Sequence, residues 1–255
     1  MPTREHAPVG APCWVDLSTS DVDHARAFYS ELFGWTPGEP SPEFGGYFMF
    51  LDGGVPVAGA APRMGDEPPP DGWMVYLCVE DMTRTIVLAE ASAGHVATGP
   101  MSIADMGTMA LIRDASGAAV GAWQPGTFAG FTRYGEVGTP IWFELLSRDY
   151  PSAVAFYKST FDWTTETMSD TAEFRYTVAL NDGEYLAGVM DASAMLPDGT
   201  SSHWSTYFGV SDVDRIVEAI VNLGGSVTVE PHDSPYGRLA GVTDPMGAPF
   251  SVMAR

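Results

Sequence analysis

Four apolar stretches along the chain each end at an aspartate that precedes a helix-like pattern. These stretches are LSTSDV at 17–22, LCVEDM at 77–82, ELLSRDY at 144–150 and FGVSDVD at 208–214. The apolar run of each predicts a strand, and its aspartate is placed to accept hydrogen bonds from the first free N–H groups of a helix. The four predicted capping residues are Asp21, Asp81, Asp149 and Asp212.

The residues after each capping aspartate predict one helix and then three short strands. Beyond Asp21 the apolar residues recur every three or four positions and end near a glycine, which predicts one buried helix face. These residues are Ala25, Phe28, Tyr29, Leu32 and the terminating Gly34. Strands are expected at 47–51 and 55–60, separated by the turn residues Asp52-Gly53-Gly54. The chain is therefore expected to contain four βαβββ modules.

A long internal repeat divides the chain into two halves. The segment AFYSELFGW at 27–35 returns 128 residues later as AFYKSTFDW at 155–163. Upstream, WVDL at 14–17 returns as WFEL at 142–145, and downstream DASGA at 114–118 returns as DPMGA at 244–248. Such self-similarity indicates two copies of one structural unit.

The repeat sets the expected domain boundaries. We expect a first domain at 10–126, with modules 12–62 and 72–125, and a second at 140–255, with modules 140–192 and 202–254. The segment between them, 127–139, is rich in glycine and threonine without apolar periodicity, which predicts a linker. A length of 255 residues suits two domains of this size.

Paired βαβββ modules with these repeated motifs resemble the glyoxalase, bleomycin-resistance and dioxygenase superfamily, also called vicinal oxygen chelate proteins. The opening GAPCWVDL at 10–17 is similar to that of tandem two-domain glyoxalase-like proteins of actinobacteria. The resemblance implies an α+β fold in which each pair of modules curls into an open eight-stranded barrel. It also implies that the concave face of each barrel holds a ligand or a metal ion.

The positions at which this family places its metal ligands carry unsuitable residues. By the resemblance, ligands stand seven residues before each capping aspartate and four residues after the glycine of each final strand. Here those positions hold Trp14, Met74, Trp142, Ser205, Gly121 and Ser251. Divalent metals in proteins prefer imidazole, carboxylate or thiolate donors. We therefore expect that this protein lacks the family metal and needs no other cofactor.

Strand alternation predicts which residues share the concave face with those positions, because residues i and i+2 point to one side. Asp16 is expected on the same strand face as Trp14, and Glu144 on the same face as Trp142. Tyr76 shares a face with Met74, and both His203 and Tyr207 share one with Ser205. Two interpretations of the carboxylates remain open. They are either ligand anchors or proton acceptors with raised pKa, or structural groups satisfied by backbone N–H groups or by an arginine such as Arg113 or Arg238.

The candidate site residues follow from this face. The catalytic candidates are Glu144, Asp16 and His203. The candidates for ligand binding are Trp14, Met74, Tyr76, Trp123, Trp142, Ser205, Tyr207 and Arg238. A lone histidine or a strand tryptophan is more often structural than functional, so a purely structural role is the alternative for these residues.

Charge and composition exclude several partners. Twelve basic against 33 acidic residues give a net charge of −21, which disfavours nucleic acids and anionic membranes. Only two cysteines are present, and no leader-like or long apolar segment opens or crosses the chain, so a cytoplasmic protein without disulfides is expected. We expect a monomer or a homodimer that binds a small-molecule ligand or substrate.

Two functions remain open from the sequence. The first is binding of an aromatic or apolar small molecule, such as a natural product, in a cavity lined by tryptophan, methionine and tyrosine. The alternative is a glyoxalase-like or cofactor-independent tailoring enzyme of lyase, isomerase or hydroxylase type, which uses a cavity carboxylate as general base.

Overall fold

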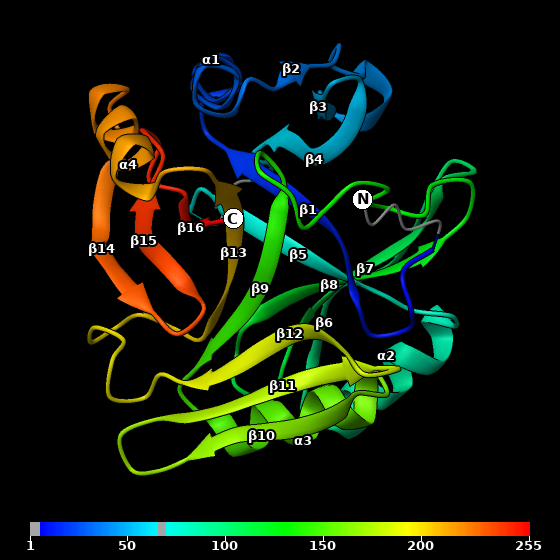
Figure 1. The fold of residues 1–255 in the computed structure, drawn as a ribbon. Coiled ribbons are helices and arrows are strands. Elements are labelled where there is room, and N and C mark those ends of the chain that lie inside the picture. Colours follow the sequence, from blue (N-terminus) through cyan, green and yellow to red (C-terminus); the bar gives the residue numbers. More distant parts are fainter. Residues whose placement is uncertain (1–5, 66–69) are drawn as a thin grey trace.

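The computed structural model describes residues 6–65 and 70–255 and contains two open eight-stranded sheets, one from each half of the chain (Figure 1). The strand orders are β2-β3-β4-β1-β5-β8-β7-β6 and β10-β11-β12-β9-β13-β16-β15-β14. The two orders are the same when counted from the first strand of each half. The α+β fold with two open sheets is therefore confirmed.

The strands of the first sheet are β1 (Pro12–Thr19), β2 (Thr36–Pro37), β3 (Phe48–Asp52), β4 (Val55–Pro62), β5 (Gly72–Cys78), β6 (His95–Ile103), β7 (Gly107–Arg113) and β8 (Ala119–Pro125). Those of the second sheet are β9 (Pro140–Ser147), β10 (Thr164–Asp170), β11 (Arg175–Asn181), β12 (Glu184–Asp191), β13 (His203–Val210), β14 (Ser226–Ser234), β15 (Gly237–Thr243) and β16 (Pro249–Ala254). The strands predicted at 47–51 and 55–60 correspond to β3 and β4 within two residues.

One helix follows the first strand of each module. The helices are α1 (Val22–Phe33), α2 (Met82–Ala91), α3 (Tyr150–Thr160) and α4 (Val213–Asn222), with a short 3₁₀ helix η1 (Pro42–Phe44) after α1. All four predicted aspartate caps are confirmed, because each carboxylate accepts from the backbone N–H three residues later. The predicted end of α1 is also confirmed, since Gly34 adopts φ 74° and closes the helix.

Each sheet is centred on an antiparallel pair formed by the first strands of its two modules. In the first sheet β1 and β5 pair with Trp14 opposite Tyr76, and in the second β9 and β13 pair with Trp142 opposite Tyr207. The last strand of each first module runs parallel to the first strand of that module, β4 to β1 and β12 to β9, which places Gly59 beside Asp16 and Gly188 beside Glu144. Equivalent residues of the two halves therefore take equivalent positions.

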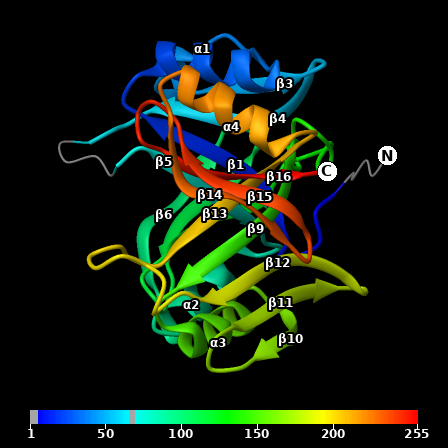
Figure 2. The ribbon, with the colours of Figure 1, turned by 60° about the vertical axis from the view of Figure 1, so that its left-hand side comes forward.

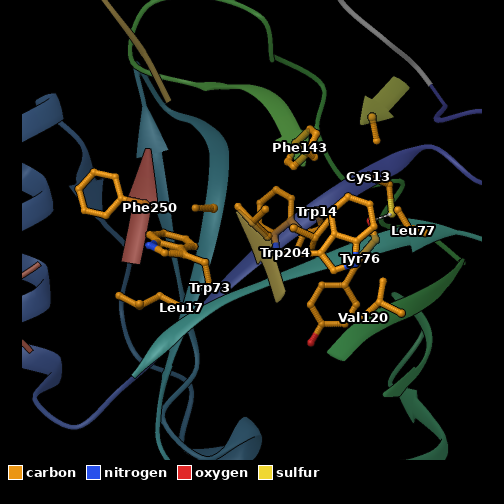
Figure 3. Packing of buried hydrophobic residues seen from close by; sticks show 14 of the residues in the cluster. Cys13, Trp14, Leu17, Trp73, Tyr76, Leu77, Val120, Phe143, Trp204 and Phe250 are labelled. Atoms are coloured by element: carbon orange, nitrogen blue, oxygen red, sulfur yellow. Dashed lines mark hydrogen bonds between the residues drawn. The ribbon is translucent and has the colours of Figure 1, made fainter. Parts of the chain in front are cut away.

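The two halves pack against each other through the faces that lie opposite the Trp14 and Trp142 side. β5 and β13 are in contact there, and Trp73 and Phe208 approach to 5.2 Å between ring centroids. Figure 3 shows Trp73 beside Leu17 and Phe250 in this core. Helix α1 lies beside α4 at one end, and α2 lies beside α3 at the other (Figure 2). Among the described residues, no helix is long and apolar enough to cross a bilayer.

Candidate functional site

A half-buried carboxylate lies at the centre of the first sheet, on the face that strand alternation gave to Trp14. The indole Nε1 of Trp14 and the hydroxyl of Tyr47 each donate to Oδ1 of Asp16, at 2.9 Å in both cases. Nε1 of Trp14 also lies 3.0 Å from the Tyr47 hydroxyl, and the Tyr76 hydroxyl bonds to the same carboxylate. Asp16 is therefore held by three aromatic donors.

The second sheet repeats this arrangement around Glu144. The hydroxyls of Tyr176 and Tyr207 donate to Oε1 and Oε2 respectively, each at 2.7 Å. Nε1 of Trp142 donates to the Tyr176 hydroxyl at 3.1 Å and does not reach the carboxylate in the bonds observed. The longer glutamate side chain thus accepts one tyrosine on each oxygen.

A glycine on the neighbouring parallel strand makes room for each cluster. A Cβ at Gly59 would overlap both the carboxylate of Asp16 and the hydroxyl of Tyr47. A Cβ at Gly188 would overlap the hydroxyl of Tyr176. Both glycines keep negative φ values, so close approach of side chains, and not backbone conformation, requires glycine here.

Burial gives both carboxylates unusual proton affinity. Desolvation raises the pKa of Asp16 to about 6, although the bonds from Tyr47, Trp14 and Tyr76 partly oppose it. Burial also raises the pKa of Glu144, against the opposing bonds from its two tyrosines. The pKa values of the tyrosines rise as well, by burial and by the adjacent carboxylate, so their hydroxyls stay protonated and act as donors.

The partners of the carboxylates differ from those considered in the structural interpretation. Arg113 donates to the carbonyl of Gly117. Arg238, a predicted ligand-binding residue, is tied at the exposed surface to Asp214 of α4 and to Asp233. Neither arginine reaches Asp16 or Glu144 in the bonds observed, and hydroxyl and indole donors take the place that was expected for guanidinium or backbone N–H groups.

The other predicted residues surround the two clusters. Met74 stands opposite Asp16, and Ser205 opposite Glu144. The Ser205 hydroxyl lies 3.2 Å from that of Ser251, and Nε1 of Trp123 donates to the carbonyl of Phe128 at 2.9 Å. His203 begins β13, and its Nδ1 lies 2.9 Å from the Ser201 carbonyl, so this histidine is at the margin of the cluster.

Sequence reasoning missed Tyr47 and Tyr176. The two residues occupy equivalent places in the halves, but the residues around them are dissimilar, so the repeat did not mark them. Each reaches, across one intervening strand, a carboxylate that lies 31 or 32 residues away in the chain. Only the strand order β3-β4-β1 and its counterpart bring them together.

The concave faces do not fit the metal that the family resemblance implies. At the expected ligand positions Trp14, Met74, Trp142 and Ser205 offer no imidazole, carboxylate or thiolate donor. Each cluster has a single carboxylate, whose oxygens already accept from tyrosine. In the part of the chain that the structure describes, no group of three or more His, Cys, Asp or Glu side chains could hold a metal ion.

Comparison with known proteins agrees with this architecture. The model of the Glyoxalase/Bleomycin resistance protein/Dioxygenase superfamily matches residues 140–252. The chain is 38% identical over 258 residues to the putative glyoxylase CFP32 of Mycobacterium tuberculosis, covering 99% of this chain and 98% of that protein. It is 35% identical to the anthracycline biosynthesis protein DauV of Streptomyces sp. strain C5, covering 96% and 93%.

Solved structures share the fold at low sequence identity. The Mn(II)-bound glyoxalase from Novosphingobium aromaticivorans superposes with a TM-score of 0.64 at 16% identity, covering 96% of this chain and 82% of that chain. The 2,3-dioxygenase LapB from Pseudomonas sp. KL28 superposes with a TM-score of 0.65 at 12% identity, covering 97% and 92%. The family-model match and the full-length identity to CFP32 show that the chain belongs to the glyoxalase/bleomycin resistance protein/dioxygenase superfamily.

Proposed function

We propose that this protein binds a planar aromatic small molecule that bears hydroxyl or carbonyl groups, and that the site is a concave sheet face. The observation that carries the proposal is the repeated cluster of one buried carboxylate, two tyrosine hydroxyls and a tryptophan indole. Small-molecule sites are mostly apolar walls with a few fixed polar groups, and this cluster supplies both.

The hydrogen-bond inventory of the cluster leaves capacity for a ligand. Tyr176 and Tyr207 use their protons on Glu144, so their oxygens can act only as acceptors. Tyr176 already accepts from Trp142 and Tyr207 from Ser251, which leaves each oxygen one lone pair for a ligand. A phenolic or enolic hydroxyl of a ligand can donate to these oxygens, while its ring covers the adjacent indole. The relative DauV is named for anthracycline biosynthesis, and anthracyclines are polycyclic aromatic compounds with such hydroxyl and carbonyl groups.

Titration calorimetry with quinizarin, a dihydroxyanthraquinone, tests this function. We expect saturable binding at neutral pH that weakens by about tenfold or more when Asp16→Asn and Glu144→Gln are combined, because ligand hydroxyls then lose a charged network. The Arg113→Lys variant lies outside the clusters and should bind as the unaltered protein does. Absence of saturable binding, or equal binding by the double variant, would argue against the proposal.

A second candidate is proton transfer, favoured by the pKa of Asp16 at about 6. A general base works best when its pKa lies near the operating pH. Asp16 would take a proton from a hydroxyl-bearing carbon next to a carbonyl, and the electron pair would pass to the carbonyl oxygen, giving an enediolate. The hydroxyls of Tyr47 and Tyr76, released when Asp16 is protonated, would donate to the enediolate oxygens. Asp16 would return its proton to the former carbonyl carbon while the hydroxyl proton moves to the neighbouring oxygen, so that the original hydroxyl carbon becomes the new carbonyl.

Turnover separates the two candidates. The relative CFP32 carries the name of a putative glyoxylase, so methylglyoxal with glutathione is the first substrate mixture to assay. An enzyme of this type would form the thioester at a rate that Asp16→Asn or Glu144→Gln reduces by about a hundredfold or more. If the protein binds quinizarin but the reaction runs only at the uncatalysed rate, the enzyme candidate fails and the binding function stands.

A further inference from the structure

The two concave faces differ at the tryptophan that begins each cluster. Trp14 is only 4% exposed, because the ring of Phe128 meets it edge-on at 4.9 Å and that of Phe131 lies at 5.2 Å. Trp142, its counterpart, is partly exposed. Trp142 stands opposite Tyr207 and donates to the Tyr176 hydroxyl. Within residues 6–65 and 70–255, no ring lies over the Trp142 indole as Phe128 and Phe131 lie on Trp14.

The segment that covers Trp14 is fixed at both sides of the first sheet. The backbone N–H of Phe128 donates to the carbonyl of Met106, and the Phe128 carbonyl accepts from Nε1 of Trp123. The backbone N–H of Phe131 donates to the Cys13 carbonyl on β1. Residues 126–131 therefore cross one end of the first concave face, and the ring of Phe128 lies between Trp14 and Trp123.

The second sheet has the same strand pairing as the first but carries different side chains at equivalent positions. Met253 lies between β15 and β13 in the second sheet, at the position that Trp123 occupies between β7 and β5 in the first. A thioether therefore replaces an indole at this position. Ser205 and Ser251 stand where Met74 and Gly121 stand in the first sheet, and Glu144 with its tyrosines lies next to them. An aromatic floor, a flexible apolar wall and hydroxyl groups thus meet on a face where Trp142 keeps solvent access.

We infer that the second sheet is the ligand site and that an aromatic ring of the ligand takes on Trp142 the place that Phe128 takes on Trp14. The inference rests on the proposed binding function and assigns it to one sheet. The chain itself shows which chemistry suits this place, since a phenyl ring held edge-on to the indole, beside a hydrogen-bonded carbonyl, fills it in the first sheet. The expected stoichiometry is therefore one ligand bound per chain.

Calorimetry with quinizarin on matched variants of the full chain tests the assignment. We expect one site per chain, an affinity loss of about tenfold or more for Trp142→Ala and for Glu144→Gln, and little change for Asp23→Asn on the exposed side of α1. Phe128→Ala opens the first face, so a second site should appear. Combining it with Trp142→Ala should leave one site, now sensitive to Asp16→Asn. Near-UV circular dichroism checks that each variant is folded.

Several results would overturn the inference. Two equal sites in the unaltered chain would place ligand on both sheets, and unchanged binding by Trp142→Ala would place it elsewhere. A dimer that buries Trp142, dissociates on Trp142→Ala and excludes quinizarin would assign this face to a second copy of the chain. If the unaltered protein binds no quinizarin and forms no such dimer, the proposed function itself fails, and the inference fails with it.

Discussion

Tyr157 in the second half of the chain donates a hydrogen bond of 2.9 Å to Oδ2 of Asp114 in the first half. The reciprocal bond joins Tyr29 of the first half to Oδ2 of Asp244 in the second, at 3.1 Å. Each tyrosine hydroxyl also accepts from a buried indole, Trp204 or Trp73. The repeated helix motif and the repeated Asp-x-x-Gly turn are therefore the two sides of one interface, which the chain uses twice.

We predict that Tyr157→Phe destabilises the whole protein. The change leaves Asp114 Oδ2 and Trp204 Nε1 without their shared partner in a fully buried setting, which costs about 1–3 kcal/mol in the free energy of unfolding. Urea unfolding followed by tryptophan fluorescence gives the value. The exposed Tyr236→Phe should change it by less than about 0.5 kcal/mol. A loss no larger than that control would mean that the reciprocal bond contributes little.

We predict that Asp16→Asn stabilises the fold at neutral pH. The pKa of Asp16 rises from 3.8 to about 6 in the folded state, so the folded chain holds this proton more tightly than the unfolded chain. The unaltered protein should therefore lose stability as the pH rises from about 4 to about 6, and the loss should be complete above that window. Asparagine keeps an acceptor for Tyr47 and Trp14 without the charge.

The expected gain for Asp16→Asn is about 1–3 kcal/mol at pH 7 to 8, shrinking to almost nothing below pH 4. Urea unfolding at several pH values measures the difference between variant and unaltered protein. A constant difference across pH would show that Asp16 titrates alike in the folded and unfolded chains. Asp23→Asn, on the exposed side of α1, controls for a general change in net charge.

We predict that Gly188→Ala disrupts the second cluster. The added methyl group would overlap the hydroxyl of Tyr176, which would have to leave Glu144 and expose a buried carboxylate oxygen without its donor. The expected cost is about 2 kcal/mol or more, with weaker quinizarin binding. Gly99→Ala is the matched strand control, because a methyl group there meets nothing within 4 Å. Equal effects of the two changes would contradict the tight packing seen at Gly188.

We predict that Arg148 holds the loop at residues 192–202 in place. Its guanidinium donates to the carbonyls of Thr200 at 2.6 Å and Leu196 at 3.0 Å, and it also reaches Ser193 and Pro197. Lysine cannot reproduce this planar set of donors. Arg148→Lys should therefore raise the rate of chymotrypsin cleavage within this loop several-fold, whereas Arg215→Lys on α4 should not. Unchanged cleavage would show that the loop is held by other contacts.

Local signals in the sequence are sufficient for the secondary structure and for the faces of the strands. The aspartate caps and Gly34 depend on residues within one helical turn, and alternation places Trp14 with Asp16 whatever the strand pairs with. The internal repeat then supports each assignment twice. For this reason the four modules and the shared face of Asp16 and Glu144 with their tryptophans follow from local signals and the internal repeat. The α+β fold of two open sheets was implied by the family resemblance that those motifs carry.

Partnerships between distant segments are decided only by the tertiary structure. Whether Glu144 meets an arginine, a backbone amide or Tyr176 depends on strand order and register, and the chain between them gives no local sign of either. The same holds for Tyr157 and Asp114, which are 43 residues apart and belong to different halves. The coverage of Trp14 by Phe128 arises from the path of a segment without periodicity. Sequence thus determined the repeated parts, because short-range hydrogen bonding and alternation specify them, and packing determined what each part contacts.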